Sequence, residues 1–187
     1  MVRNVKRVIS IILIICLIAS FSITGAFAAG EDYRGWAQSD SRWGNLPMGS
    51  SGSTVSSIGC CVTSVTKLII QAGLRNSNDF NVGTLVRWLN NNGGGKPGEC
   101  VSGWSNYGDV LGYGSYSSSS YNDQMIAWIR KGLHMLINVN SGGHWVAVDE
   151  AKSLATGQIY IMDSLSGAQN TDLTLASRYA SFNAIHA

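Results

Sequence analysis

The sequence is poor in cysteine and in charge, and both shortages narrow its possible functions. Its 187 residues include 4 cysteines, too few for a scaffold held together by disulfides. Three of the 13 lysines and arginines lie within the first seven residues, which leaves ten against 11 acidic residues in the rest of the chain. No block of basic residues occurs, so we do not expect nucleic acid as a partner.

Long apolar runs are missing as well, apart from one near the amino terminus. Three basic residues precede the apolar residues 8–23, and the small residues of Ala26-Phe27-Ala28 follow. This order is typical of a secretory signal peptide, and we assign residues 1–28 to it. An uncleaved membrane anchor is the alternative, although the run is shorter than the roughly 20 residues that a span prefers. We therefore expect a secreted protein with no stable membrane insertion after cleavage.

The remaining residues 29–187 have the length of one domain and contain no internal repeat. They keep an odd number of cysteines, Cys60, Cys61 and Cys100, which predicts at least one thiol available for chemistry. A Cys61–Cys100 disulfide stays open as an alternative. A zinc site from Cys60, Cys100 and His144 is conceivable, but the sequence lacks the short paired spacing of zinc ligands, so we expect no metal.

The clearest helical periodicity follows Gly59. Apolar residues recur from Cys61 to Ala72, and Gly73 stands where a helix favours a left-handed residue. Cys61 belongs to this apolar stripe, whereas Cys60 falls on the other side with Ser64, Lys67 and Gln71. A thiol in the first turn of a helix faces unpaired N–H groups that stabilise its thiolate, so Cys60 is the candidate nucleophile. A buried structural thiol is the alternative, since cysteine is often buried.

The rest of the pattern predicts helices first and strands later. We expect an irregular segment at 29–57 anchored by Trp36 and Trp43, an aromatic loop at 102–116 that is a candidate substrate wall, and a flexible connector at 117–120. We expect further helices at 81–91 and 121–131, strands at 133–139, 144–149 and 158–163, and a loop at 151–157. This order indicates an α+β domain with an antiparallel sheet.

Two of the predicted strands bring a histidine and an aspartate together. If 144–149 and 158–163 pair around the intervening loop, residues whose numbers sum to about 308 lie opposite each other, which places His144 across from Asp163 or Ser164. Such a pair can activate a cysteine, because the imidazole takes the thiol proton and the carboxylate orients the imidazole. Asp149 is an alternative acid on the opposite face, and His134, within the preceding strand, is expected to be structural.

Gln38 is the candidate for the remaining role. A glutamine upstream of a nucleophilic cysteine can lend its side-chain amide to an oxyanion hole.

A series of short motifs resembles the papain-like cysteine peptidases. It is most similar to family thirty-nine of the cysteine peptidases, typified by bacteriocin-leader-processing domains. The motifs are Gln38-Ser39-Asp40-Ser41-Arg42-Trp43-Gly44, Gly59-Cys60-Cys61-Val62-Thr63-Ser64, Arg130-Lys131-Gly132, Gly143-His144-Trp145-Val146-Ala147-Val148-Asp149 and Ile159-Tyr160-Ile161-Met162-Asp163. Two positions depart from the family, where many relatives have a small residue or glycine at Cys61 and proline at Ser164.

The resemblance implies a papain-like fold, with the nucleophile helix packed on a C-terminal antiparallel sheet. It implies Cys60 as nucleophile, His144 as base, Asp163 as orienting acid and Gln38 as oxyanion donor, with no cofactor or metal. We expect a secreted, monomeric bacterial thiol hydrolase that cleaves peptide bonds. The alternatives are a peptidoglycan amidase or endopeptidase with the same triad, and a non-catalytic binding or toxin-like module.

Overall fold

The computed structural model describes residues 30–92, 112–115, 121–165, 172–179 and 181–186. The chain divides into two units, Met1–Gly30 and Glu31–Ala187, and all the elements below belong to the second. No helix in the described ranges is long and apolar enough to cross a membrane. The predicted leader, the connector at 117–120 and most of the predicted aromatic loop lie outside these ranges.

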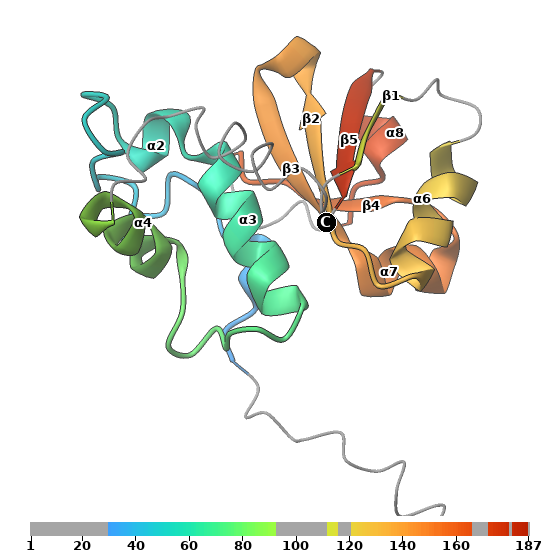
Figure 1. Ribbon diagram of the computed structural model, residues 1–187, viewed down its shortest axis with the longest axis horizontal. Coiled ribbons are helices and arrows are strands. Elements are labelled where there is room, and N and C mark those ends of the chain that lie inside the picture. Colours follow the sequence, from blue (N-terminus) through green and yellow to red (C-terminus); the bar gives the residue numbers. More distant parts are fainter. Residues whose placement is uncertain (1–29, 93–111, 116–120, 166–171, 180, 187) are drawn as a thin grey trace, which may run out of the picture. The chain divides into compact units, whose positions relative to one another are not determined.

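Helices dominate the first half of the domain and strands the second (Figure 1). The helical elements are η1 (Tyr33–Gly35), α2 (Val55–Ile58), α3 (Cys60–Gln71), α4 (Val82–Asn91), α6 (Tyr121–Arg130), η2 (Asn140–Gly142), α7 (Glu150–Thr156) and α8 (Leu175–Arg178). The strands are β1 (Gly112–Ser115), β2 (Met135–Val139), β3 (His144–Asp149), β4 (Tyr160–Met162) and β5 (Phe182–His186).

The five strands form one sheet in the order β1-β5-β2-β3-β4, and every neighbouring pair is antiparallel. The predicted α+β class is therefore confirmed. In the pairing of β3 with β4, Ala147 lies opposite Met162 and Asp149 opposite Tyr160. The observed sum of paired residue numbers is thus 309, one residue from the predicted register.

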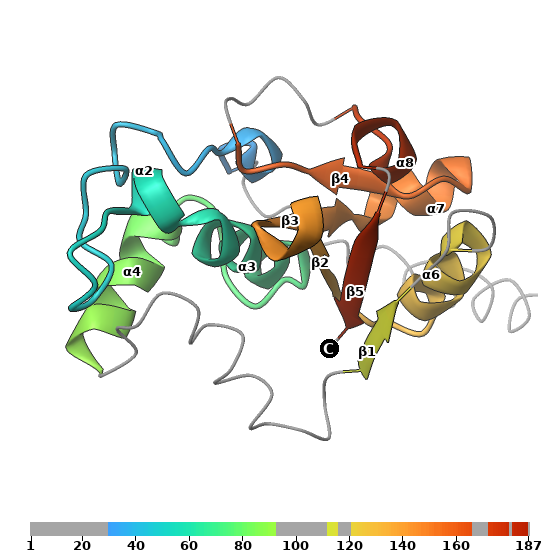
Figure 2. The same ribbon diagram turned by 90° about the horizontal axis from the view of Figure 1, so that it is seen from above.

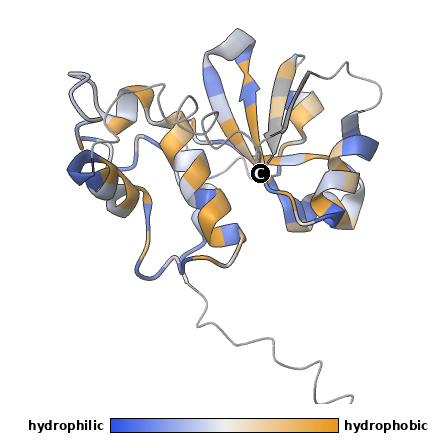
Figure 3. Ribbon diagram, in the orientation of Figure 1, coloured by the Kyte–Doolittle hydropathy of each residue, from blue (hydrophilic) through white to orange (hydrophobic). Residues whose placement is uncertain are grey.

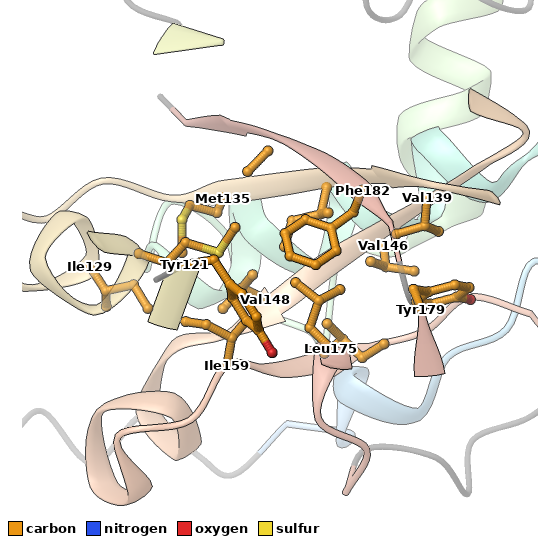
Figure 4. Close-up of a cluster of buried hydrophobic side chains, with 14 of the residues drawn as sticks. Tyr121, Ile129, Met135, Val139, Val146, Val148, Ile159, Leu175, Tyr179 and Phe182 are labelled. Carbon is orange, nitrogen blue, oxygen red and sulfur yellow. The ribbon is translucent and has the colours of Figure 1, made fainter. Parts of the chain in front are cut away.

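Helices cover both faces of this sheet (Figures 1 and 2). Successive side chains of a strand point to opposite faces, so each strand contributes to both layers of packing. On one face, Leu136, Ala147 and Met162 pack against Cys61, Val65 and Leu68 of α3. On the other face, alternate strand residues pack with α6 and α8, and Figure 4 shows part of this cluster. It comprises Tyr121, Met125, Ile126, Ile129, Met135, Ile137, Val139, Val146, Val148, Ile159, Ile161, Leu175, Tyr179, Phe182 and Ala184.

A separate core holds the segment before α3. Trp36 and Trp43 are buried and meet edge to face, with ring centroids 5.3 Å apart. They pack with apolar residues of α2, α3 and α4, among them Val55, Val62 and Val86. This segment is mostly irregular, as predicted, but contains η1 and the start of the one-turn helix α2. Its tryptophans pack against apolar residues of the helices, which are orange in Figure 3.

The structure corrects the predicted loop at 151–157, which is the helix α7. Asp149 caps this helix, since its carboxylate accepts a hydrogen bond from the N–H of Lys152 at 3.0 Å. Gly157 ends it with a φ of 73°, a left-handed conformation that glycine adopts without strain. The sequence signal of this helix is an N-cap aspartate and a terminal glycine eight residues apart, in a connection that we predicted as a loop.

Other elements that were not predicted belong to the sheet or lie beside it. β1 lies within the predicted aromatic loop, and α8 and β5 follow the last predicted strand. β5 is an inner strand between β1 and β2, although it is short and includes Asn183 and His186. Its place in the sheet follows from long-range pairing with β2, from Met135–His186 to Val139–Phe182, which no local pattern announces.

Candidate active site

Cys60 is the first residue of α3 and carries a free, half-buried thiol. Gly59 joins α3 to α2 in so little space that a Cβ there would lie 2.4 Å from the carbonyl oxygen of Val55. Only glycine therefore allows the chain to turn from one helix directly into the next. This turn places the Cys60 side chain at the N-terminal end of α3, where helix N–H groups favour negative charge.

His144 and Asp163 meet as predicted, at the same end of neighbouring strands. The Nε2 atom of His144 lies 2.7 Å from Oδ1 of Asp163, and both side chains are almost fully buried. Asp163 occupies Nε2, so Nδ1 is the ring nitrogen left for Cys60, whose interaction with His144 raises the pKa of the imidazole. Thiol, imidazole and carboxylate therefore form one connected series.

The electrostatics of this series favour a charged imidazole and a charged carboxylate. Burial lowers the pKa of His144, but hydrogen bonds to Asp163 and Cys60 and the charges of these groups more than offset it, and the pKa rises to about 9. Burial raises the pKa of Asp163, but hydrogen bonds from His144, Tyr179 and the N–H of Leu165 bring it down to about 2. At neutral pH the pair is thus imidazolium and carboxylate.

Asp163 has more partners than the sequence indicated. Its Oδ1 also accepts from the N–H of Leu165 at 2.8 Å, and its Oδ2 accepts from the hydroxyl of Tyr179 at 2.6 Å. Arg178 approaches Oδ2 to 3.5 Å from the exposed side. Both oxygens are therefore held, which fixes the carboxylate plane toward His144.

Tyr179 follows α8, in a part of the chain for which we made no prediction. Its ring centroid lies 6.2 Å from that of His144, and Figure 4 shows it at one end of the apolar cluster, beside Val139 and Val146. The proximity of Tyr179 to Asp163 depends on the packing of α8, so no motif in the sequence points to it.

Gln38 lies beside the site, with its side-chain amide already engaged. Its backbone N–H donates to the carbonyl of Ser164 at 3.0 Å, and its Nε2 donates to the carbonyl of Ser56 at 2.7 Å. Its Oε1 is buried without a hydrogen-bond partner. One amide hydrogen thus remains for another acceptor, and the oxyanion role of Gln38 stays a prediction.

Ser164, where many members of the resembled family have proline, is fully buried among the site's backbone segments. Its hydroxyl lies 3.4 Å from the carbonyl oxygens of both Cys60 and Trp145, and its own carbonyl accepts from Gln38. The serine therefore connects the segments that carry Cys60, His144 and Gln38.

The polar side of α3 is not the exposed face that the presence of lysine and glutamine would suggest. Ser64 and Lys67 are completely buried, and Gln71 is half-buried. Ser64 donates to the carbonyl of Trp145 at 3.0 Å, and Gln71 donates to that of Val148 at the same distance. Directional bonds therefore hold α3 on the sheet alongside the apolar contacts of Cys61.

The other candidates lie elsewhere. Asp149 is at the far end of β3, where it caps α7. His134 precedes β2 rather than lying within it, and its Nδ1 is 2.8 Å from Oε1 of Glu150. Cys100, required for the zinc and disulfide alternatives, lies outside the described residues.

Comparison of the chain with known proteins finds no matching family model, no matching curated protein and no matching solved structure.

Proposed function

We propose that the protein is a papain-like thiol hydrolase that cleaves amide bonds in peptides with Cys60, His144 and Asp163. The observation that carries this proposal is the buried 2.7 Å contact between His144 and Asp163 beside a thiol at a helix N-terminus. A histidine with a structural role does not need an acid on one side and a thiol on the other. A thiol nucleophile needs an adjacent histidine as base and an acid that orients this histidine.

In the proposed reaction, the sulfur of Cys60 attacks the carbonyl carbon of the scissile amide and forms a carbon–sulfur bond. The backbone N–H of Cys60 and the free amide hydrogen of Gln38 bind the oxygen that becomes negative. The imidazolium of His144 donates its proton to the leaving amine as the carbon–nitrogen bond breaks. Neutral His144 then removes a proton from water, the water oxygen attacks the thioester, and the peptide acid leaves as the thiolate and imidazolium are restored.

Asp163 keeps the imidazole in position throughout these steps. Its carboxylate accepts a hydrogen bond from Nε2–H, so Nδ1 is the nitrogen that exchanges a proton with sulfur and substrate. The apparent signal peptide adds to the proposal that the enzyme acts outside the cell, on peptides there or on the peptide stems of the cell wall.

The test uses the purified protein with two classes of substrate and a thiol probe. We expect release of new amino termini from casein or a peptide library, and no release by Cys60→Ser. A peptide-bond enzyme would act on these substrates more readily than on purified cell wall, and the opposite preference would indicate the cell-wall amidase.

The probe separates an enzyme from a binding module of the same fold. We expect iodoacetamide to label Cys60 faster in the wild type than in His144→Gln. Equal labelling rates, together with no cleavage of any amide substrate, would contradict the proposed function.

A further inference from the structure

Lys67 is a completely buried lysine on the nucleophile helix, seven residues after Cys60 and so about two turns away. Its Nζ donates to the carbonyl oxygens of Met162 and Asp163, each at 3.2 Å. In the described part of the chain no carboxylate forms a salt bridge with this ammonium group. The lysine therefore joins α3 to the backbone of the acid by hydrogen bonds alone.

This position is unfavourable for the stability of the fold. Burial lowers the pKa of Lys67 to about 7, against the opposing effect of the charges of Asp163 and Asp32. The neighbouring residues of the helix that face the sheet, Val65 and Leu68, are apolar and pack well. An apolar side chain of similar length would fill the same space without the penalty of removing a charge from water.

The two carbonyls that Lys67 binds lie where the chain leaves the sheet. The pairing of β3 with β4 ends at Ala147 and Met162, so Asp163 lies beyond the last pair. Its backbone is therefore not fixed by a strand partner, although its side chain must reach His144 within hydrogen-bond distance.

We propose that Lys67 is a positioning residue, which fixes the backbone of Asp163 relative to the nucleophile helix and so aligns the carboxylate with His144 and Cys60. This inference rests on the proposed function. Nucleophile and acid belong to different elements, and Lys67 is a direct polar connection between them. Small misplacements of catalytic groups reduce rates steeply, which explains why a destabilising lysine is useful here.

The deciding variant is Lys67→Met, which keeps the length of the side chain and removes the donor. We expect its melting temperature to stay close to that of the wild type, because removal of the buried ammonium group offsets the loss of its two hydrogen bonds. We expect kcat to fall by about tenfold or more with little change in KM, since substrate contacts are untouched and the alignment of the triad is lost. Loss of stability in proportion to activity would overturn the inference, and so would unchanged kcat.

Gln71→Met is the matched control on the same side of α3. It removes a donor to the carbonyl of Val148 and an acceptor for the N–H of Glu150, both at the end of β3 away from the triad. We expect the reverse result, a lower melting temperature with kcat unchanged. Equal effects of the two variants on kcat would show that any polar contact of the helix matters, which overturns a specific role for Lys67.

Two further arms make the result decisive. Lys67→Gln keeps a hydrogen-bond donor on a side chain that is too short to reach both carbonyls, and we expect the same loss of kcat. Unfolding of both Lys67 variants would overturn the inference, because it would show a structural role. The pH profile of Cys60 alkylation needs no substrate. A wild type that cleaves nothing would defeat the proposed function, whereas identical alkylation profiles in wild type and Lys67→Met would defeat the role of Lys67.

Discussion

Replacing Tyr179 with phenylalanine removes one hydroxyl from the surroundings of Asp163 and leaves the ring in place. This hydroxyl donates to Oδ2 over 2.6 Å in a buried setting. A hydrogen bond to a charged group contributes about 1.5–3 kcal/mol, and the burial of this carboxylate keeps bulk solvent from replacing the bond. We therefore expect the free energy of unfolding at neutral pH to fall by about 1.5–3 kcal/mol in Tyr179→Phe.

The effect on hydrolysis should be partial. His144 and the N–H of Leu165 still hold Oδ1, and Arg178 lies 3.5 Å from Oδ2, so the carboxylate stays charged and close to its position. If about 1.4 kcal/mol of the lost interaction appears in the transition state, kcat/KM falls by about tenfold. The pKa of Asp163 should rise, because one of the hydrogen bonds that lower it is gone.

Urea unfolding and peptide hydrolysis measure the two effects. Tyr160→Phe is the matched control, since it also removes a single hydroxyl, from a half-buried ring that packs under Lys152 away from the triad. We expect the control to change both quantities little. A Tyr179→Phe variant that unfolds and hydrolyses like the wild type would refute the assignment of Tyr179 as a support of the acid.

Three other predictions concern the triad and its neighbours. Cys60→Ser should abolish hydrolysis with little change in melting temperature. Cys61→Ser should stay active and lose about 1–3 kcal/mol of stability, because it places a hydroxyl in an apolar cluster. The reverse result would move the nucleophile to Cys61. Asp163→Asn should lower kcat much more than Asp149→Asn. An asparagine at 149 can still cap α7, whereas an asparagine at 163 can hold the wrong tautomer of His144. Equal losses in rate assays would contradict the assignment. The stability difference between wild type and Asp163→Asn should depend on pH. The raised pKa of His144 stabilises the fold below about pH 6.5, and this contribution is lost as the pH rises through about 9. The lowered pKa of Asp163 stabilises the fold above about pH 3.8, and this contribution is lost as the pH falls through about 2. Unfolding curves should therefore show the largest difference from about pH 4 to 6.5, and a difference independent of pH would exclude an ion pair.

The sequence predicted the parts of the fold that have a local period. The apolar repeat after Cys60 predicted α3, and alternation predicted β2 and β3, the latter with the observed bounds. The two failures have different causes. β5 depends on pairing with a strand more than forty residues earlier, and α7 was hidden because Asp149 reads equally well as the end of a strand and as a helix cap.

The same division applies to the site. The contact between His144 and Asp163 could be predicted because the register of two neighbouring strands places them together, and the structure confirms that contact. Tyr179 and Lys67 could not be predicted, since their distances to Asp163 follow from how α8 and α3 pack. The lysine was also misleading, because a charged residue on a helix is usually exposed, and this one is buried.

The helix α7 joins β3 to β4 at the end of these strands opposite to His144 and Asp163. A break in the chain after Gly157, where α7 ends, would leave Cys60 and His144 on the first fragment and Asp163 with Tyr179 on the second. Neither fragment alone would carry the whole triad, and pairing of β4 with β3 would restore it. If Cys60 is the nucleophile, the protein is thus divided in a way that suits a split enzyme, whose activity would report the association of two partners fused to its halves.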